Sequence, residues 1–221
     1  MTRRETIVDS SSLLAAIQSV INDEYKEIVH VNYKLIETKN LGDSSKCSEL
    51  EIHGNTTNYS FTLDKVVACV CSSQLEPLRV LRKSAPYVNK KNDLIVLCPS
   101  DSTSLQLNAY IFELKSKNTG EAATQILAGK VLVEYLINLL RISFNITSEI
   151  QVNFFGILAS LAMRQPHIPS NISTFEYNLN NVSRNGVTIP ILHWHANNKF
   201  YLTDFHRKII ANKNINILKH P

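Results

Sequence analysis

The sequence predicts a single domain of the mixed α/β class, built on a central β-sheet flanked by helices. A length of 221 residues suits one domain of this kind. Hydrophobic residues make up 44% of the chain and charged residues 19%, so the chain can form a packed core. Strand-like and helix-like segments alternate without an internal repeat or a clear linker, and one layered domain is the simplest architecture for that order.

The first part of the chain, residues 1–80, predicts a short helix followed by an antiparallel β region. Asp9 and the three serines after it are typical of a helix start, and apolar residues then recur at helical spacing to about residue 23. Segments rich in β-branched residues follow, separated by turns that contain Asn and Gly. We expect strands over Glu27–Thr38, Glu49–His53 and Tyr59–Leu63, an extension over Val66–Val70, and a short helix over Gln74–Lys83.

The central part, residues 81–160, predicts two strands, a long helix and a third strand. These elements cover Asp93–Cys98, Ala109–Lys115, Glu121–Arg141 and Ile150–Leu158. The helix is apolar around much of its circumference, which indicates that it is covered on more than one side.

The last part of the chain, residues 161–221, predicts a β-hairpin within a basic region. Ile189–His195 and Lys199–Thr203 flank an Ala-Asn-Asn turn and are typical of the two hairpin strands. From residue 160 onward, seven Lys and Arg residues face two Asp and Glu residues, while the whole chain carries a net charge of +4. A basic region favours a polyanionic partner, although a solvated surface without a partner would explain the same charges.

Several classes of protein are excluded or disfavoured. No apolar run reaches the roughly 18 residues that span a bilayer, and no apolar stretch follows the N-terminal arginines, so we expect a cytoplasmic protein. The four cysteines lack the spacing of a usual zinc site and should be reduced and mostly buried. Phosphate-loop, dinucleotide-binding and serine-hydrolase motifs are absent from the sequence.

The charged residues at the end of one apolar strand carry the most chemical information. Side chains alternate along a strand, so Glu113 and Lys115 share one face, where burial without partners would be costly. The preceding strand starts with Asp93, and antiparallel pairing would bring that start beside the end of the next strand. Two carboxylates and a lysine would then meet at one sheet edge, which suits a hard divalent cation held by oxygen ligands.

This pattern resembles the PD-(D/E)xK nuclease superfamily: Asp93, nineteen intervening residues, and then Glu113-Leu114-Lys115. The resemblance implies a restriction-endonuclease-like fold and a Mg²⁺-dependent phosphodiesterase, with Mn²⁺ as a substitute ion. Asp93, Glu113 and the Leu114 carbonyl would bind the metal. Lys115 would be the catalytic lysine, and Gln125, early in the following helix, would support the site.

The resemblance also implies an endonuclease that acts on DNA, in a setting of prokaryotic defence or restriction. Such an enzyme would work as a homodimer or as the effector subunit of a larger complex. Basic residues near the motif are expected to contact the phosphate backbone without reading bases. They are Arg82, Lys83, Lys90, Lys91 and Lys117. RNA as the substrate, the number of metal ions, and a further acid such as Glu24 or Glu27 stay open.

Each of these residues could also have a purely structural role. Glu113 and Lys115 could form an exposed cross-strand pair of little energetic value. Asp93 could be a turn residue, and Gln125 an exposed helical glutamine. At the level of function, the alternatives are a catalytically dormant nuclease-fold subunit that binds DNA or acts as a scaffold, and a protein-binding module that uses the acidic N-terminal β region.

A second candidate site lies in the C-terminal region. His193 and His195 share one face of a strand, a spacing that can ligate a metal. Asp204 and His206 follow shortly afterwards and are candidates for further ligands. The competing interpretation is a surface anchored by Trp194.

Overall fold

The computed structural model of the chain describes the residues given at the end of this paragraph. Within them, three α-helices, two short 3₁₀ helices and two β-sheets are formed. The 3₁₀ helices are η1 (Asp23–Tyr25) and η3 (Ile172–Thr174). The described residues are 7, 9–29, 32–36, 49–54, 57–62, 92–100, 105–115, 120–161, 172–196, 198–211 and 215–218.

The larger sheet is mixed and has eight strands. Their spatial order is β1 (Lys26–Glu27), β4 (Tyr59–Phe61), β5 (Leu94–Pro99), β6 (Gln106–Lys115), β7 (Gln151–Ser160), β9 (Val187–His195), β8 (Tyr177–Arg184) and β11 (Ile215–Leu218). Strands β4, β5 and β6 pair antiparallel, whereas β6 with β7 and β7 with β9 pair parallel. A long helix links the parallel strands β6 and β7, as parallel pairing requires. The predicted mixed α/β class, with a mixed sheet and flanking helices, is confirmed.

The strands of the predicted N-terminal β region are shared between the larger sheet and a smaller one. The smaller sheet contains β10 (Lys199–Tyr201), β3 (Glu49–His53) and β2 (Tyr33–Ile36), with β10 parallel to β3 and β3 antiparallel to β2. The predicted strand over Glu27–Thr38 is broken, because Asn32 adopts a positive φ of 66° between β1 and β2. Strands β1 and β4 join the larger sheet instead.

The predicted C-terminal hairpin is wrong. Strand β9 pairs with β7 and β8, while β10 pairs with β3 in the other sheet, so Ile189–His195 and Lys199–Thr203 do not form a ladder with each other. The hairpin in this region joins β8 to β9 through Asn185 and Gly186, which have φ values of 50° and 80°. Asn-Gly is the preferred pair for such a two-residue turn, so the signal was present in the sequence.

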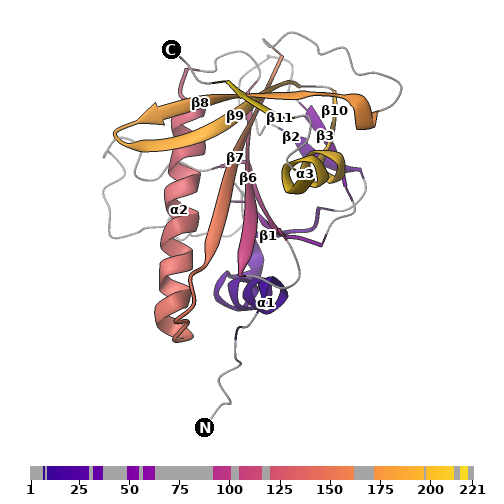
Figure 1. Cartoon of the computed structure of the whole chain (residues 1–221). Helices are drawn as coiled ribbons and strands as arrows, with labels where there is room; N and C mark the ends of the chain where they lie inside the picture. Colours follow the sequence, from indigo (N-terminus) through magenta and orange to yellow (C-terminus); the bar gives the residue numbers. More distant parts are fainter. Residues whose placement is uncertain are drawn as a thin grey trace, which may run out of the picture.

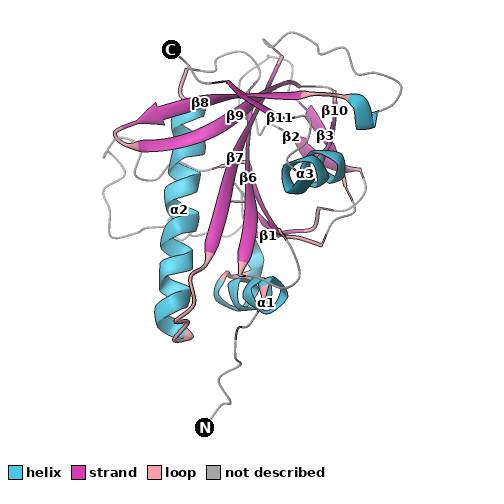
Figure 2. Cartoon of the chain, in the orientation of Figure 1, coloured by secondary structure: helices cyan, strands magenta, loops and turns pink. Residues whose placement is uncertain are grey.

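Three helices cover the two faces of the larger sheet. Helices α1 (Ser10–Val20) and α2 (Ala122–Ser143) lie against one face, and α3 (Leu202–Ala211) lies with the smaller sheet against the other (Figure 1; Figure 2). Side chains of β6 alternate accordingly: Ile111 packs with the α1 and α2 core, and Tyr110 with the α3 core. The fold is therefore three layers around two apolar cores.

The helix starts follow local rules where the sequence provides them. Asp9 caps α1: its Oδ1 accepts a hydrogen bond from the Ser12 amide at 2.8 Å, and the Ser12 hydroxyl accepts one from the Asp9 amide. Helix α3 was not predicted from the sequence, because the strand expected to continue to Thr203 gives way to a helix at Leu202. Predicted elements over Val66–Val70 and Gln74–Lys83 lie outside the described residues.

Helix α2 packs with one face on the sheet, where it also contacts α1. Its buried residues include Ile126, Val133, Ile137 and Leu140. Apolar residues on the opposite face, such as Tyr135, are exposed. The expectation that this helix is covered on more than one side is therefore wrong from Val131 onward, where no described element covers the outer face. Near the start of the helix, Thr124 accepts a hydrogen bond from Arg184 of the β8–β9 hairpin.

Candidate active site

The strands β5 and β6 bring the predicted motif residues together. Their antiparallel register pairs Leu94 with Phe112, so Asp93 and Glu113 follow as the next opposing positions. The Leu114 amide donates a hydrogen bond to Asp93 Oδ2 at 2.5 Å. Lys115 Nζ lies 2.6 Å from Glu113 Oε1. The predicted antiparallel pairing is confirmed, and it brings Asp93 and Glu113 to opposing positions at this end of the sheet.

The burial of this cluster is uneven. The Glu113 side chain is 1% exposed, whereas that of Lys115 is 24% exposed. Glu113 is covered because β6 lies between β5 and β7 in the interior of the sheet, whereas Lys115 is the last residue of that strand. The alternative that Glu113 and Lys115 form an exposed pair at the sheet edge is therefore wrong for Glu113. A buried carboxylate with its ammonium partner carries a large desolvation cost, and this makes the pair a candidate for function.

Helix α2 holds the start of β5 in place. Asn92, which is fully buried, donates its amide to the Gln125 carbonyl at 2.9 Å. Gly129 permits this approach, since a Cβ at that position would lie 2.4 Å from Asn92 Oδ1 and 2.9 Å from Ile111 Cγ2. Gln125 therefore lies in the first turns of α2, near the residue that precedes Asp93. The contact that links it to β5 is made by its backbone carbonyl.

The parallel strands add two residues that sequence reasoning did not connect with the motif. Register pairs Lys115 with Ser160 on β7, and Ser160 in turn with His195 on β9. Ser160 is fully buried. The His195 Nδ1 atom is buried and has no hydrogen-bond partner within the part of the chain that the structure describes. No local pattern could have found this row, because it depends on the order β6-β7-β9.

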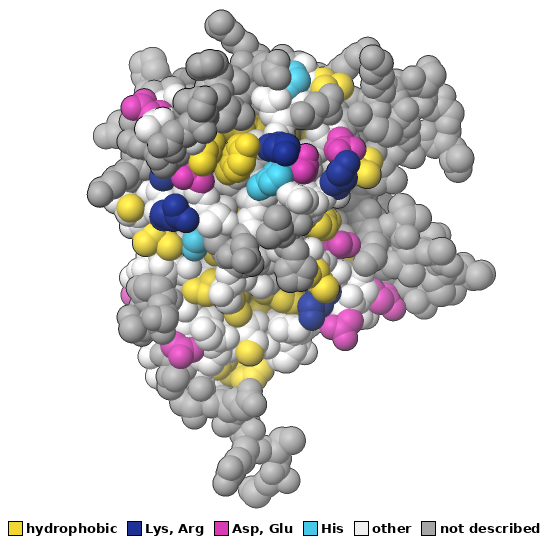
Figure 3. All heavy atoms as spheres, turned by 90° about the vertical axis from the view of Figure 1, so that its right-hand side faces the viewer, with side chains coloured by type: hydrophobic (Ala, Val, Ile, Leu, Met, Phe, Trp, Pro, Cys, Tyr) yellow, Lys and Arg dark blue, Asp and Glu magenta, His cyan; other side chains and the backbone are white. Residues whose placement is uncertain are grey.

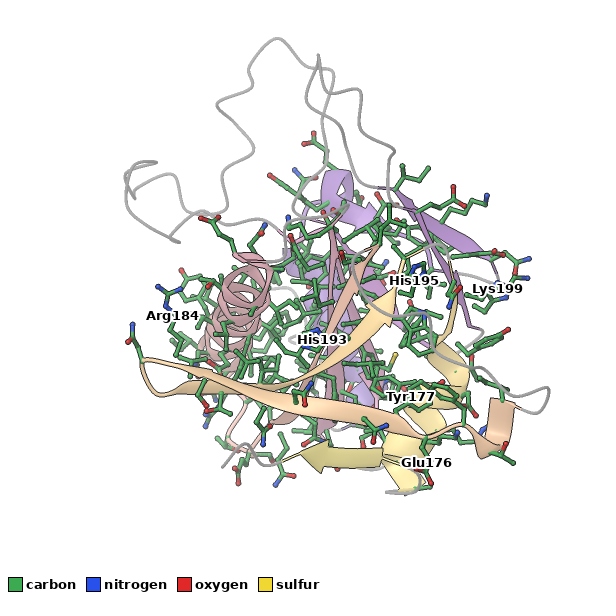
Figure 4. The ribbon with its side chains drawn as sticks, turned by 90° about the horizontal axis from the view of Figure 1, so that it is seen from above. Glu176, Tyr177, Arg184, His193, His195 and Lys199 are labelled. Atoms are coloured by element: carbon green, nitrogen blue, oxygen red, sulfur yellow. The ribbon has the colours of Figure 1, made fainter. Side chains whose placement is uncertain are left out.

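The second candidate site is not assembled. His193 and His195 lie along β9 (Figure 4) and alternate with residues of the α3 core, so they belong to the α2 face. Burial lowers the pKa of His193. Asp204 and His206 lie in α3 on the opposite face of the sheet, where Asp204 Oδ2 accepts a hydrogen bond from Tyr177 at 3.1 Å. The sheet therefore lies between the two histidines of β9 and the two residues of α3, and the four side chains do not meet.

Acidic residues near the N-terminus do not complete the cluster. Glu24 lies in η1, and Glu27 lies in β1, which β4 separates from β5. Over the described ranges, no group of three or more His, Cys, Asp or Glu side chains is arranged to hold a metal ion. Cys98 is a free, buried cysteine. Among the described residues, Asp93 and Glu113 are the acidic side chains that the β5–β6 pairing brings to the candidate site.

The basic residues expected to contact phosphate are not among the described residues. Arg82, Lys83, Lys90, Lys91 and Lys117 all lie outside the described residues. On the face formed by α3 and the smaller sheet, Lys and Arg side chains are interspersed with Asp and Glu (Figure 3). The described part of that face therefore carries mixed charge.

Comparison with known proteins adds no relative. No protein family, no curated protein and no solved structure matches the chain. Within the described residues, none of the helices combines the length and the apolarity needed to cross a membrane. The interpretation of the site therefore depends on its own geometry and on the pattern of its residues.

Proposed function

We propose that this chain is a Mg²⁺-dependent endonuclease of the PD-(D/E)xK type that hydrolyses phosphodiester bonds, in the first place those of DNA. The observation that carries the proposal is the contact between Asp93 and the Glu113-Leu114-Lys115 segment across β5 and β6. The succession β5, β6, α2 and β7 is also the one expected from the resemblance, with Gln125 in the helix. A restriction-endonuclease-like fold is part of this proposal.

The donor set fits a hard divalent cation. Asp93 and Glu113 supply carboxylate oxygens and Leu114 a backbone carbonyl, and these are the ligand types that Mg²⁺ and Mn²⁺ accept. When bound, the cation would act as a Lewis acid on the scissile phosphate. Glu113 keeps its carboxylate in a buried position beside an ammonium group, an arrangement whose energetic cost a purely structural strand could avoid with apolar residues.

The residues of the chain would have separate roles. The Leu114 amide fixes the orientation of the Asp93 carboxylate, so this group is preorganised. Lys115 is partly exposed and can reach a water molecule, which its ammonium group would orient for in-line attack on phosphorus. Asn92 and the Gln125 carbonyl hold the start of β5 against α2, so Gln125 would act as a positioning residue.

A catalytically dormant subunit is the second candidate function. In this case the chain would bind DNA or act as a scaffold in a larger complex, such as one in prokaryotic defence. The direct contact between Lys115 and Glu113 favours it, because the ammonium group already neutralises the buried carboxylate. The two candidates differ in one property: only the nuclease requires Asp93 and Lys115 for chemistry.

A cleavage assay with purified protein tests the proposal. Supercoiled plasmid, single-stranded DNA and single-stranded RNA are incubated with Mg²⁺, Mn²⁺ or EDTA. Wild type should cut only with a metal ion, and Asp93→Asn and Lys115→Ala should each lose at least about a hundredfold in rate. Lys34→Ala is the matched control, since Lys34 also pairs with a glutamate but at the surface, and it should cut like wild type.

The outcomes separate the alternatives. Cleavage that survives both active-site substitutions would show that the residue assignment is wrong. Folded protein that binds DNA with steep salt dependence, but never cuts under any of the metal conditions, would favour the dormant subunit. Cleavage of RNA alone would keep the chemistry and change the substrate.

A further inference from the structure

The outer face of α2 carries an apolar stripe that no described element covers. Its members are Val131, Tyr135, Leu139 and Ile142, which are 49%, 48%, 41% and 80% exposed. They lie opposite the residues that α2 buries against the sheet. Contiguous exposed apolar surface of this kind is typical of a site of protein association.

The spacing along the stripe is that of a helix–helix seam. Val131, Tyr135, Asn138 and Ile142 follow one another at steps of four, three and four residues, so they fall on one line along the helix. On each side of the seam lies a pair of residues that are seven positions apart in the sequence. One flank has Leu132, which also packs partly against the core, and Leu139. The other flank has Glu134 and Arg141, both exposed, and Glu134 Oε1 lies 3.7 Å from Lys130 Nζ of the same helix. A second helix is therefore the partner shape that fits this face.

We propose that two copies of this chain associate through their α2 helices, packed antiparallel around a two-fold axis. In that arrangement Val131 faces the partner's Ile142, and Tyr135 faces the partner's Asn138. The flanks then match as well: Leu132 meets the partner's Leu139. Glu134 meets the partner's Arg141, and symmetry makes each of these contacts twice.

The charges select this arrangement over a parallel one. In a parallel pair, the position of Glu134 faces the position of the partner's Leu139, so the charged flank of one helix would meet the apolar flank of the other. The antiparallel pair places acid beside base and leucine beside leucine. A face that complements itself in this way points to a second copy of the chain as its occupant.

The β8–β9 hairpin contacts α2 near the start of the helix. At its tip, Arg184 Nη1 donates a hydrogen bond to the Thr124 hydroxyl at 2.7 Å, and Figure 4 shows Arg184 beside α2. Thr124 lies in line with the stripe, near the start of the helix. In the antiparallel pair the partner helix ends, at its Ser143, level with Lys130. The contact at Thr124 therefore lies outside residues 130–143, the stretch of α2 that the partner helix would cover.

Charge exchange tests both the interface and its direction. Sedimentation velocity over a concentration series should show wild type moving from the 25.0 kDa chain to twice that mass. Glu134→Arg or Arg141→Glu alone places like charges opposite each other twice, and should weaken dimerisation roughly tenfold. The double variant, with both substitutions, restores the acid–base contacts between the two copies and should bind more tightly than either single variant. It stays weaker than wild type, because Lys130 then lies beside an arginine instead of Glu134.

Apolar substitutions provide the matched control. Ile142→Glu should abolish the dimer, whereas Ile210→Glu, at a half-exposed isoleucine of helix α3, should leave it unchanged. Circular dichroism of each variant confirms that it is folded. The inference does not depend on nuclease activity. A wild type that stays at 25.0 kDa at every concentration, a dimer that survives Ile142→Glu, or a double variant that fails to recover would each overturn it.

Discussion

Replacing Lys115 with methionine should destabilise the fold by about 2–4 kcal/mol. Removing one partner of a buried ion pair costs about 3–5 kcal/mol, because the remaining charge keeps its desolvation penalty. Glu113 is 1% exposed, and its oxygen lies 2.6 Å from Lys115 Nζ. Lys115 itself is 24% exposed, so water can partly replace the lost ammonium group. This places the expected loss toward the lower end of the range.

The double variant Glu113→Gln with Lys115→Met should recover most of that stability. Replacing both members of a buried pair with uncharged groups is often neutral or stabilising by about 1–4 kcal/mol. The surface pair of Lys34 and Glu49 is the control, with a distance of 2.9 Å and side chains 57% and 41% exposed. Its coupling free energy should stay below about 1 kcal/mol, because exposed pairs are well solvated.

Urea unfolding at neutral pH, followed by the fluorescence of the single tryptophan, Trp194, measures these differences. Trp194 is 1% exposed in the core beneath α3, so its emission should report global unfolding. Plasmid cleavage by the same proteins provides the second readout, since every variant at Glu113 or Lys115 should be inactive whatever its stability. A Lys115→Met loss as small as that of Lys34→Met would refute the burial argument, and so would a double variant as unstable as the single one.

Three further predictions concern the rest of the fold. Gly129→Ala should destabilise by about 1–2 kcal/mol in urea unfolding, although alanine is the better helix former, because its Cβ would overlap with Asn92. Burial lowers the pKa of His206, so the unfolded chain binds more protons below about pH 6.5. Stability should fall as the pH decreases through that range, and thermal unfolding of His206→Gln should show a weaker dependence. Gly186→Ala should cost about 1 kcal/mol in thermal unfolding, purely from its φ of 80°, as no atom lies within 4 Å of the added Cβ.

Local signals in the sequence were sufficient for most of the individual elements. The Asp9 cap and the helical spacing after it predicted α1, and alternation predicted β3 over Glu49–His53 with the observed bounds. Alternation along β6 also predicted that Glu113 and Lys115 share a face, and their contact at 2.6 Å agrees with that. These properties depend on residues that are close in the chain, where backbone geometry alone fixes which side chains meet.

Strand pairing was predicted only where the strands are neighbours in sequence. The pairing of β5 with β6 is of this kind, and it placed Asp93 beside the Glu113-Leu114-Lys115 segment. The predicted hairpin of β9 with β10 also joined neighbours in sequence, but these two strands do not pair. Both strands have better partners far away in the chain, in β7 and β3, and those partners bury apolar side chains such as Phe200 and Trp194 completely.

The sequence by itself determined most of the elements and the pairing that places Asp93 opposite Glu113. Only the tertiary structure decided that Glu113 is buried, because that follows from β6 lying between β5 and β7. It also decided that His195 belongs to the row of Lys115, and that the outer face of α2 is left open. The physical reason is the same in each case. Burial and sheet order are set by which distant segments exclude water together, and no local pattern encodes that choice.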